Sequence, residues 1–113
     1  MAMLAATSSL MACPVGGTFV VNDVVGSDDE NRHYVDLVGG TPSTVDLVGF
    51  CFKIGLANVD LFVYDDQQNL VGKSTGISCS ERVTFIPEWT GTYKLVVSTK
   101  NHQFPVQYHL VVG

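Results

Sequence analysis

Three adjacent acidic residues, Asp28, Asp29 and Glu30, place three carboxylates in one short polar turn. Hard cations such as calcium are held by several oxygen ligands, so a carboxylate cluster of this kind predicts a calcium site. The spacing does not match an EF-hand loop, however, and carboxylates that only face solvent are the alternative. Calcium is the one cofactor that the sequence suggests.

The segment Asp60–Asp65 holds a second candidate site, a pair of aromatic residues. Leu61 and Val63 alternate with Phe62 and Tyr64, and successive side chains of a strand point to opposite faces of its sheet. If Leu61 and Val63 face the core, Phe62 and Tyr64 share the outer face. Exposed aromatic pairs are typical of surfaces that bind protein or polysaccharide. The alternatives are that the N-terminal segment of the chain covers the two rings, or that they form the second packed face of a central strand.

Catalytic motifs are missing from the sequence. It contains neither the GxSxG turn of an α/β-hydrolase nor the HExxH pair of a zinc protease. The fragment Gly72–Thr75 resembles the end of a nucleotide-binding loop, but Gln67 stands where that loop needs its first glycine. His33, His102 and His109 show no short metal-binding spacing. We therefore expect a protein that is not an enzyme, with a hydrolase assembled from distant Ser, His and Asp residues as the alternative.

The charge and length of the chain narrow the possible classes of protein further. Eleven acidic and six basic residues give a formal net charge of −5, and the basic residues are scattered. Nucleic acid is not an expected partner, because it requires clustered Lys and Arg. No apolar run is long enough for a membrane-spanning helix. We predict a single domain over 1–113, in which 17–113 form the folded body.

Residues 1–16 form an uncharged, largely apolar N-terminal segment. Leu10–Cys13 resembles the lipobox of a bacterial lipoprotein, although Met11 replaces the usual small residue. No Lys or Arg lies near Met1, so the charged start of a secretory signal is missing. Three interpretations stay open: the remnant of an export signal, a short helix, or an added strand that packs on the domain or on a neighbouring copy.

Three cysteines, Cys13, Cys51 and Cys79, allow at most one internal disulfide. No CxxC pair exists, and the spacing resembles no zinc site. We expect buried or half-buried free thiols, because free cysteine is among the most buried residue types. A Cys51–Cys79 disulfide is the alternative and would favour an extracellular location.

Strand-length apolar segments, separated by turn residues, follow one another from Gly16 onward. Alternation of this kind predicts an all-β fold, an antiparallel sandwich of about eight to nine strands. The segments expected to form strands are Thr18–Val25, His33–Leu37, Thr44–Ile54, Val59–Tyr64, Leu70–Val71, Val83–Phe85, Tyr93–Val97 and Tyr108–Val112.

The segment Thr44–Ile54 breaks the simple alternation. Val45 and Leu47 stand on one parity, whereas Val48 and Phe50 stand on the other. A change of phase by one residue predicts a β-bulge near Gly49.

The stretch Pro87–Val97 links two strands through the sequence WTGTY. Trp89 is expected to cover the end of the core, with stacking on a ligand as the alternative. Gly91 is expected to turn the chain with a positive φ, which glycine adopts without steric cost. Tyr93 is expected to be the first inward residue of the next strand.

Together these segments resemble the bacterial pre-peptidase C-terminal domain. The residues on which the resemblance rests are His33-x-Val35-x-Leu37-x-Gly39, Val59–Asp65 with Asn69–Val71, Val83-x-Phe85, Gly91-Thr92-Tyr93-x-Leu95-x-Val97 and Tyr108-x-Leu110-x-Val112. The resemblance implies a jelly-roll-like β-sandwich that is appended to secreted hydrolases and is not itself catalytic. Some relatives hold calcium near the N-terminal edge, which would be Asp28–Glu30. His33 replaces a usual aromatic residue, and Asn58 replaces the first of two paired aspartates.

We therefore predict a non-catalytic binding or assembly module that acts outside the cytoplasm, in the periplasm, at the cell surface or in the extracellular medium. Its predicted partner is a protein or polysaccharide surface. A self-associating structural protein, which packs its N-terminal segment on another copy to form a homo-oligomer, is the alternative.

Overall fold

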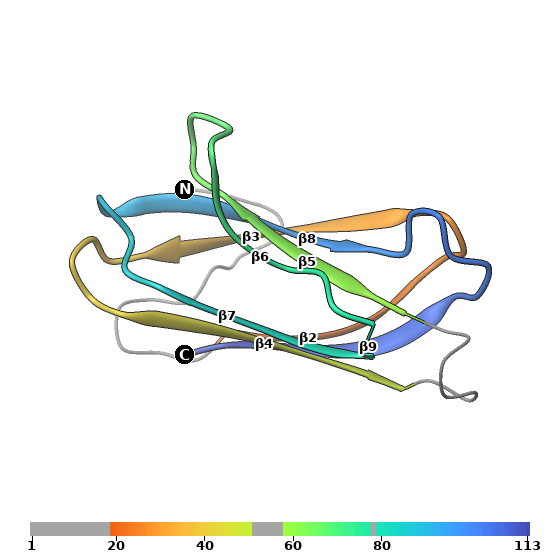
Figure 1. Cartoon of the computed structure of the whole chain (residues 1–113). Helices are drawn as coiled ribbons and strands as arrows, with labels where there is room; N and C mark the ends of the chain where they lie inside the picture. The colour runs from red at the N-terminus through yellow and green to blue at the C-terminus, as the bar shows by residue number, and fades with distance from the viewer. Residues whose placement is uncertain (1–18, 51–57, 78) are drawn as a thin grey trace.

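A computed structural model describes residues 19–50, 58–77 and 79–113 of the chain. The described residues form two antiparallel four-stranded sheets that face each other (Figure 1). One sheet has the order β2-β9-β4-β7 and the other has the order β3-β8-β5-β6. The strands are β2 (Phe19–Val25), β3 (Glu30–Leu37), β4 (Ser43–Phe50), β5 (Asp60–Tyr64), β6 (Leu70–Ser74), β7 (Ser80–Phe85), β8 (Gly91–Ser98) and β9 (Val106–Val112). The prediction of an all-β antiparallel sandwich is confirmed.

Most consecutive strands lie in different sheets. Only β5 and β6 follow each other within one sheet, as a hairpin, among the strands that the structure describes. Neighbours such as β8 and β3, or β9 and β2, are therefore far apart in the sequence. The N-terminal segment 1–16, with its three interpretations, lies outside the described residues.

The core lies between the two sheets and is built from alternate residues of the strands. Tyr93, Leu95 and Val97 of β8 are buried, as are Tyr108 and Leu110 of β9. A strand points successive side chains to opposite faces, so the sequence alternation selects these inward positions. Tyr93 and Tyr108 are the largest of the fully buried side chains.

The expected bulge near Gly49 is wrong. The register of β4 against β9 runs without interruption from Val45 opposite Val112 to Phe50 opposite Gln107. Gly49 keeps the inward parity, and a Cβ there would lie 2.5 Å from the backbone oxygen of Cys79. The apolar pattern changes parity because Val48 and Phe50, at the end of β4, are apolar residues in outward positions.

The turn before β8 is closed by a hydrogen bond from the Tyr93 hydroxyl to the backbone oxygen of Trp89, at 2.6 Å. Such a tyrosine corner fixes the chain where it crosses from one sheet to the other. Trp89 is 38% exposed, and Phe85 is the aromatic residue near this turn that packs against the core. The expected role of Trp89 as a cover of the core stays a prediction. The expected positive φ of Gly91 is wrong, because Gly91 begins β8 as an ordinary strand residue opposite Leu37.

Cys79 is disulfide-bonded. The expectation that all three cysteines are free thiols is therefore wrong for this residue. Cys13 and Cys51 lie outside the described residues, so the predicted Cys51–Cys79 pairing stays a prediction.

Candidate binding surface

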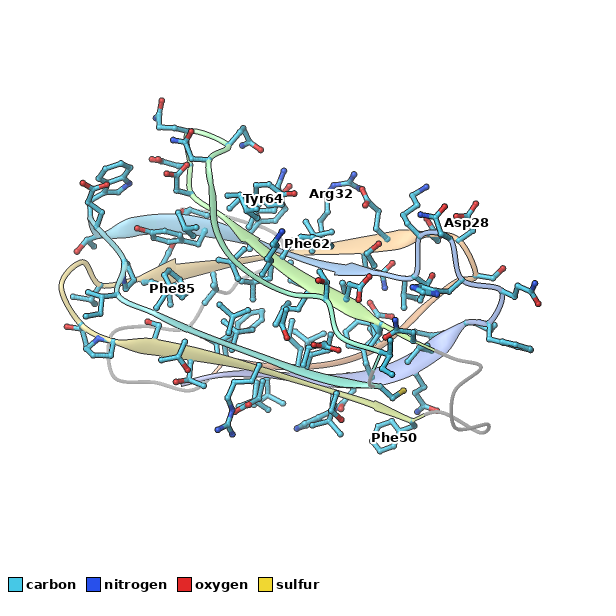
Figure 2. All side chains as sticks on the ribbon, in the orientation of Figure 1. Asp28, Arg32, Phe50, Phe62, Tyr64 and Phe85 are labelled. Carbon is cyan, nitrogen blue, oxygen red and sulfur yellow. The ribbon has the colours of Figure 1, made fainter. Side chains whose placement is uncertain are left out.

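The structure places Phe62 and Tyr64 on the outer face of the sheet β3-β8-β5-β6. Leu61 and Val63, between them, are fully buried. Phe62 and Tyr64 are half-buried and point away from the other sheet (Figure 2). The pleat of β5 therefore separates the core pair from the aromatic pair, as the sequence alternation predicts.

Two neighbouring strands extend the aromatic pair into a larger surface. The register places Lys94 of β8 beside Tyr64 and places Tyr34 of β3 beside Lys94. In the next row, Val96 of β8 stands between Arg32 of β3 and Phe62 of β5. The Lys94 ammonium lies 4.8 Å from the centroid of the Tyr64 ring, within the range of a cation–π interaction.

Lys73 of β6 completes this surface opposite Phe62. We give the name tyrosine–lysine face to six outward residues of the four strands, Arg32, Tyr34, Phe62, Tyr64, Lys73 and Lys94. Tyr34 is 57% exposed and is one of the most exposed aromatic side chains that the structure describes. Arg32 has its Nη2 atom 2.5 Å from Glu30 Oε1, an ion pair on the same strand. Three of the six basic residues of the acidic chain thus gather on one face.

The hairpin between β5 and β6 rises above this face (Figure 1). Asp65 organises it, because its Oδ1 atom accepts hydrogen bonds from the backbone N–H groups of Gln67 and Asn69, each at 2.9 Å. Partial desolvation alone would raise the pKa of Asp65, but these bonds from Asn69 and Gln67 lower it. Lys94 Nζ donates to Gln68 Oε1 at 2.7 Å and ties the hairpin to the face. The face is therefore bordered by a preorganised loop.

The acidic turn has a different arrangement from a metal site. Asp28 Oδ1 accepts the backbone N–H of Asn101 at 2.9 Å, whereas Glu30 pairs with Arg32. The backbone N–H of Asp29 donates a hydrogen bond to Thr99 Oγ1. Within the described ranges, no three acidic, histidine or cysteine side chains are grouped so that they could hold a metal ion. Calcium at this turn stays a prediction, as does the alternative of carboxylates that only face solvent.

The three histidines occupy separate places. His33 points into the sandwich, where its Nε2 atom lies 2.6 Å from the Tyr108 hydroxyl. His109 stands on the outer face of the other sheet, and His102 has its Nε2 atom 3.9 Å from Asp60 Oδ2. Burial lowers the pKa of His33, although the nearby Asp23 raises it in part. Burial also raises the pKa of Tyr108 to about 12.

His33 makes the stability dependent on pH. Its folded pKa lies below the unfolded value of about 6.5, so between the two values the unfolded chain binds more protons. Its contribution is present above pH 6.5 and is lost as the pH falls toward the folded pKa. We expect the free energy of unfolding in urea to decline from about pH 7.5 to 5, and less steeply in His33→Phe, which cannot titrate there.

The slope, rather than the absolute stability, is the informative quantity, because His33→Phe also loses the bond to Tyr108. The raised pKa of Asp60, caused first by burial, acts with the opposite sign and at lower pH, where stability rises as the pH falls. Equal slopes for His33→Phe and the wild type would contradict the assignment to His33.

Sequence reasoning found Phe62 and Tyr64 but missed Arg32, Tyr34, Lys73 and Lys94. The only signal for them was their parity, because each alternates with inward residues on its own strand. No helix among the described residues is both long enough and apolar enough to cross a membrane.

Comparison with known proteins gives a similarity of fold. No protein-family model and no curated protein matches the chain, so the resemblance to the pre-peptidase C-terminal domain stays a prediction. The chain is similar to the crystal structure of PliG from Aeromonas hydrophila, a periplasmic lysozyme inhibitor of g-type lysozyme. The TM-score is 0.61 at 13% sequence identity, over 85% of this chain and 84% of that chain. The described β-sandwich is thus a fold that this chain shares with PliG.

Proposed function

We propose that this chain is a non-catalytic module that binds another protein outside the cytoplasm, through the tyrosine–lysine face. The observation that carries the proposal is the gathering of Tyr34, Tyr64 and Arg32 on one outer face beside a preorganised hairpin. Tyr and Arg are enriched among the few residues that dominate the binding energy of protein interfaces.

The geometry of the face supports a protein partner. Tyrosine supplies a large rigid contact area at a small cost in conformational entropy, and Tyr34 is open to solvent. Lys94 is held between Tyr64 and Gln68, so part of the ordering that binding requires exists in the free chain. A preformed surface of this kind needs little rearrangement when a partner covers it.

Two observations support the location and the absence of catalysis. The disulfide at Cys79 is of a kind that persists in oxidising compartments, and PliG, which shares the fold, is periplasmic. PliG is also an inhibitor of an enzyme. The resemblance to pre-peptidase C-terminal domains fits the same role, because those domains are not catalytic.

A g-type lysozyme is the first protein to test, by calorimetric titration with the purified chain and by assay of cell-wall lysis. We expect binding that Tyr34→Ala and Tyr64→Ala each weaken by about 30-fold, equivalent to about 2 kcal/mol. Thr84→Ala, an exposed residue on the other sheet, is the matched control and should bind as the wild type does.

Other outcomes would contradict the proposal. Equal affinity in Tyr34→Ala, Tyr64→Ala and the wild type would place the site elsewhere. Binding to cell-wall polysaccharide, and not to the enzyme, would replace the protein partner by a glycan. Release of soluble sugar by the chain alone would make it a hydrolase.

A further inference from the structure

The sheet β2-β9-β4-β7 has an apolar outer face. Val20 and Val24 of β2 are 50% and 55% exposed, and Val48 and Phe50 of β4 are 42% and 53% exposed. Figure 2 shows Phe50 pointing away from the other sheet. Together with the half-buried Val111 of β9, we call these residues the valine face. Single exposed apolar residues are common, but a contiguous patch marks an interaction surface.

The strand register places the residues of the valine face in adjacent rows, with Gln107 and His109 of β9 between the apolar residues of β2 and β4. Val24 and Phe50 stand level with Gln107 of β9, on its two sides. One row further, Asn22 and Val48 stand on the two sides of His109. Adjacent strands are about 4.8 Å apart, so outward side chains of one row touch.

Two pairs of polar side chains within this sheet face bind each other. His109 Nδ1 lies 2.5 Å from Asn22 Oδ1, in the middle row. Among the outward positions of these four strands the charged residues are Asp46 and Arg82, whose atoms Oδ1 and Nε lie 2.5 Å apart. The face therefore has no net charge, whereas the chain has a net charge of −5.

We propose that a second copy of this chain covers the valine face, so that two sandwiches stack through their β2-β9-β4-β7 sheets. Two copies with the same negative charge repel each other, and they repel least where they meet through a surface of no net charge. Most dimers are two-fold symmetric, which requires a surface complementary to itself. On one side of the Asn22–His109 pair lies the row Val24, Gln107 and Phe50, and on the other side lies the row Val20, Val111 and the Asp46–Arg82 ion pair. Neither row carries a net charge, so the face meets this requirement.

The register sets the contacts of such a dimer. With the two-fold axis along β9, strand β2 of one copy lies over β4 of the other. Val24 of one copy then stands opposite Phe50 of the other, because both are level with Gln107. Both tyrosine–lysine faces remain open on the two outer sides, so the dimer is independent of the proposed function and would make the module bivalent.

The test is sedimentation equilibrium of the full chain over a range of concentrations. We expect a species of twice the mass of the chain that dissociates on dilution. Phe50→Asp and Val24→Lys should each weaken the dimer at least about tenfold, because each puts a charge into an apolar contact. The double variant should recover affinity, since Lys of one copy then meets Asp of the other.

Two controls distinguish a weakened dimer interface from a loss of folding. Ile77→Asp adds the same charge at a 93% exposed position in the loop after β6 and should leave the dimer intact. Urea unfolding must show that each variant folds. A chain that stays monomeric at high concentration, or a double variant that recovers nothing, would overturn the proposal. A monomer that Phe50→Asp destabilises would instead indicate that another part of the same chain covers the face, and would overturn the proposal as well.

Discussion

Replacing Leu95 by alanine is expected to lower the free energy of unfolding by about 2–5 kcal/mol. Leu95 is fully buried on β8, an inner strand of its sheet, between His33 of β3 and Val63 of β5. Truncation removes the transfer free energy of the lost methyl groups and leaves a cavity that close-packed neighbours fill only in part. Urea denaturation at constant pH, followed by fluorescence of Trp89, measures the change.

Lys94→Ala is the matched control for this prediction, because Lys94 directly precedes Leu95 and lies on the outer face of the same strand. It loses one cation–π contact and one bond to an exposed glutamine, so we expect a cost under about 1 kcal/mol. Equal costs for Leu95→Ala and Lys94→Ala would show that the assignment of inner and outer faces is wrong.

Replacing Gly39 by alanine is expected to destabilise the fold by about 1–3 kcal/mol or more. A Cβ at Gly39 would lie 2.6 Å from the Trp89 Cα atom and 2.8 Å from the Thr90 nitrogen, closer than real contacts allow. Both are backbone atoms, so no side chain can rotate away. The Gly39 N–H also donates to Thr90 Oγ1 at 2.9 Å, and the added methyl group would force this contact apart.

Gly26→Ala is the matched control, since the nearest atom to its Cβ would be Asp29 Oδ2 at 3.4 Å. The φ of Gly26 is not in the left-handed region. Alanine should therefore leave the stability unchanged, or raise it slightly by lowering the conformational entropy of the unfolded chain. Melting curves of both variants test the pair. If Gly39→Ala and Gly26→Ala have the same melting temperature, the close approach between the β3–β4 loop and the tyrosine corner is wrong.

The sequence by itself determined which face of most strands is buried. Tyr93, Leu95 and Val97 are inward because a pleated strand alternates with a period of two residues, which is a local property. The same local rule placed Phe62 and Tyr64 outward. It failed for Val48 and Phe50, because it assumes that apolar residues are buried, and here they form an open surface.

Only the tertiary structure decided which outward residues stand together. Tyr34, Lys94 and Tyr64 share one row because β3, β8 and β5 are neighbours, although 60 positions separate Tyr34 from Lys94. Strand pairing between distant segments depends on how the whole chain packs, and no local pattern encodes it. The same holds for Gly39, whose close contact with Trp89 arises only when two turns meet at one end of the sandwich.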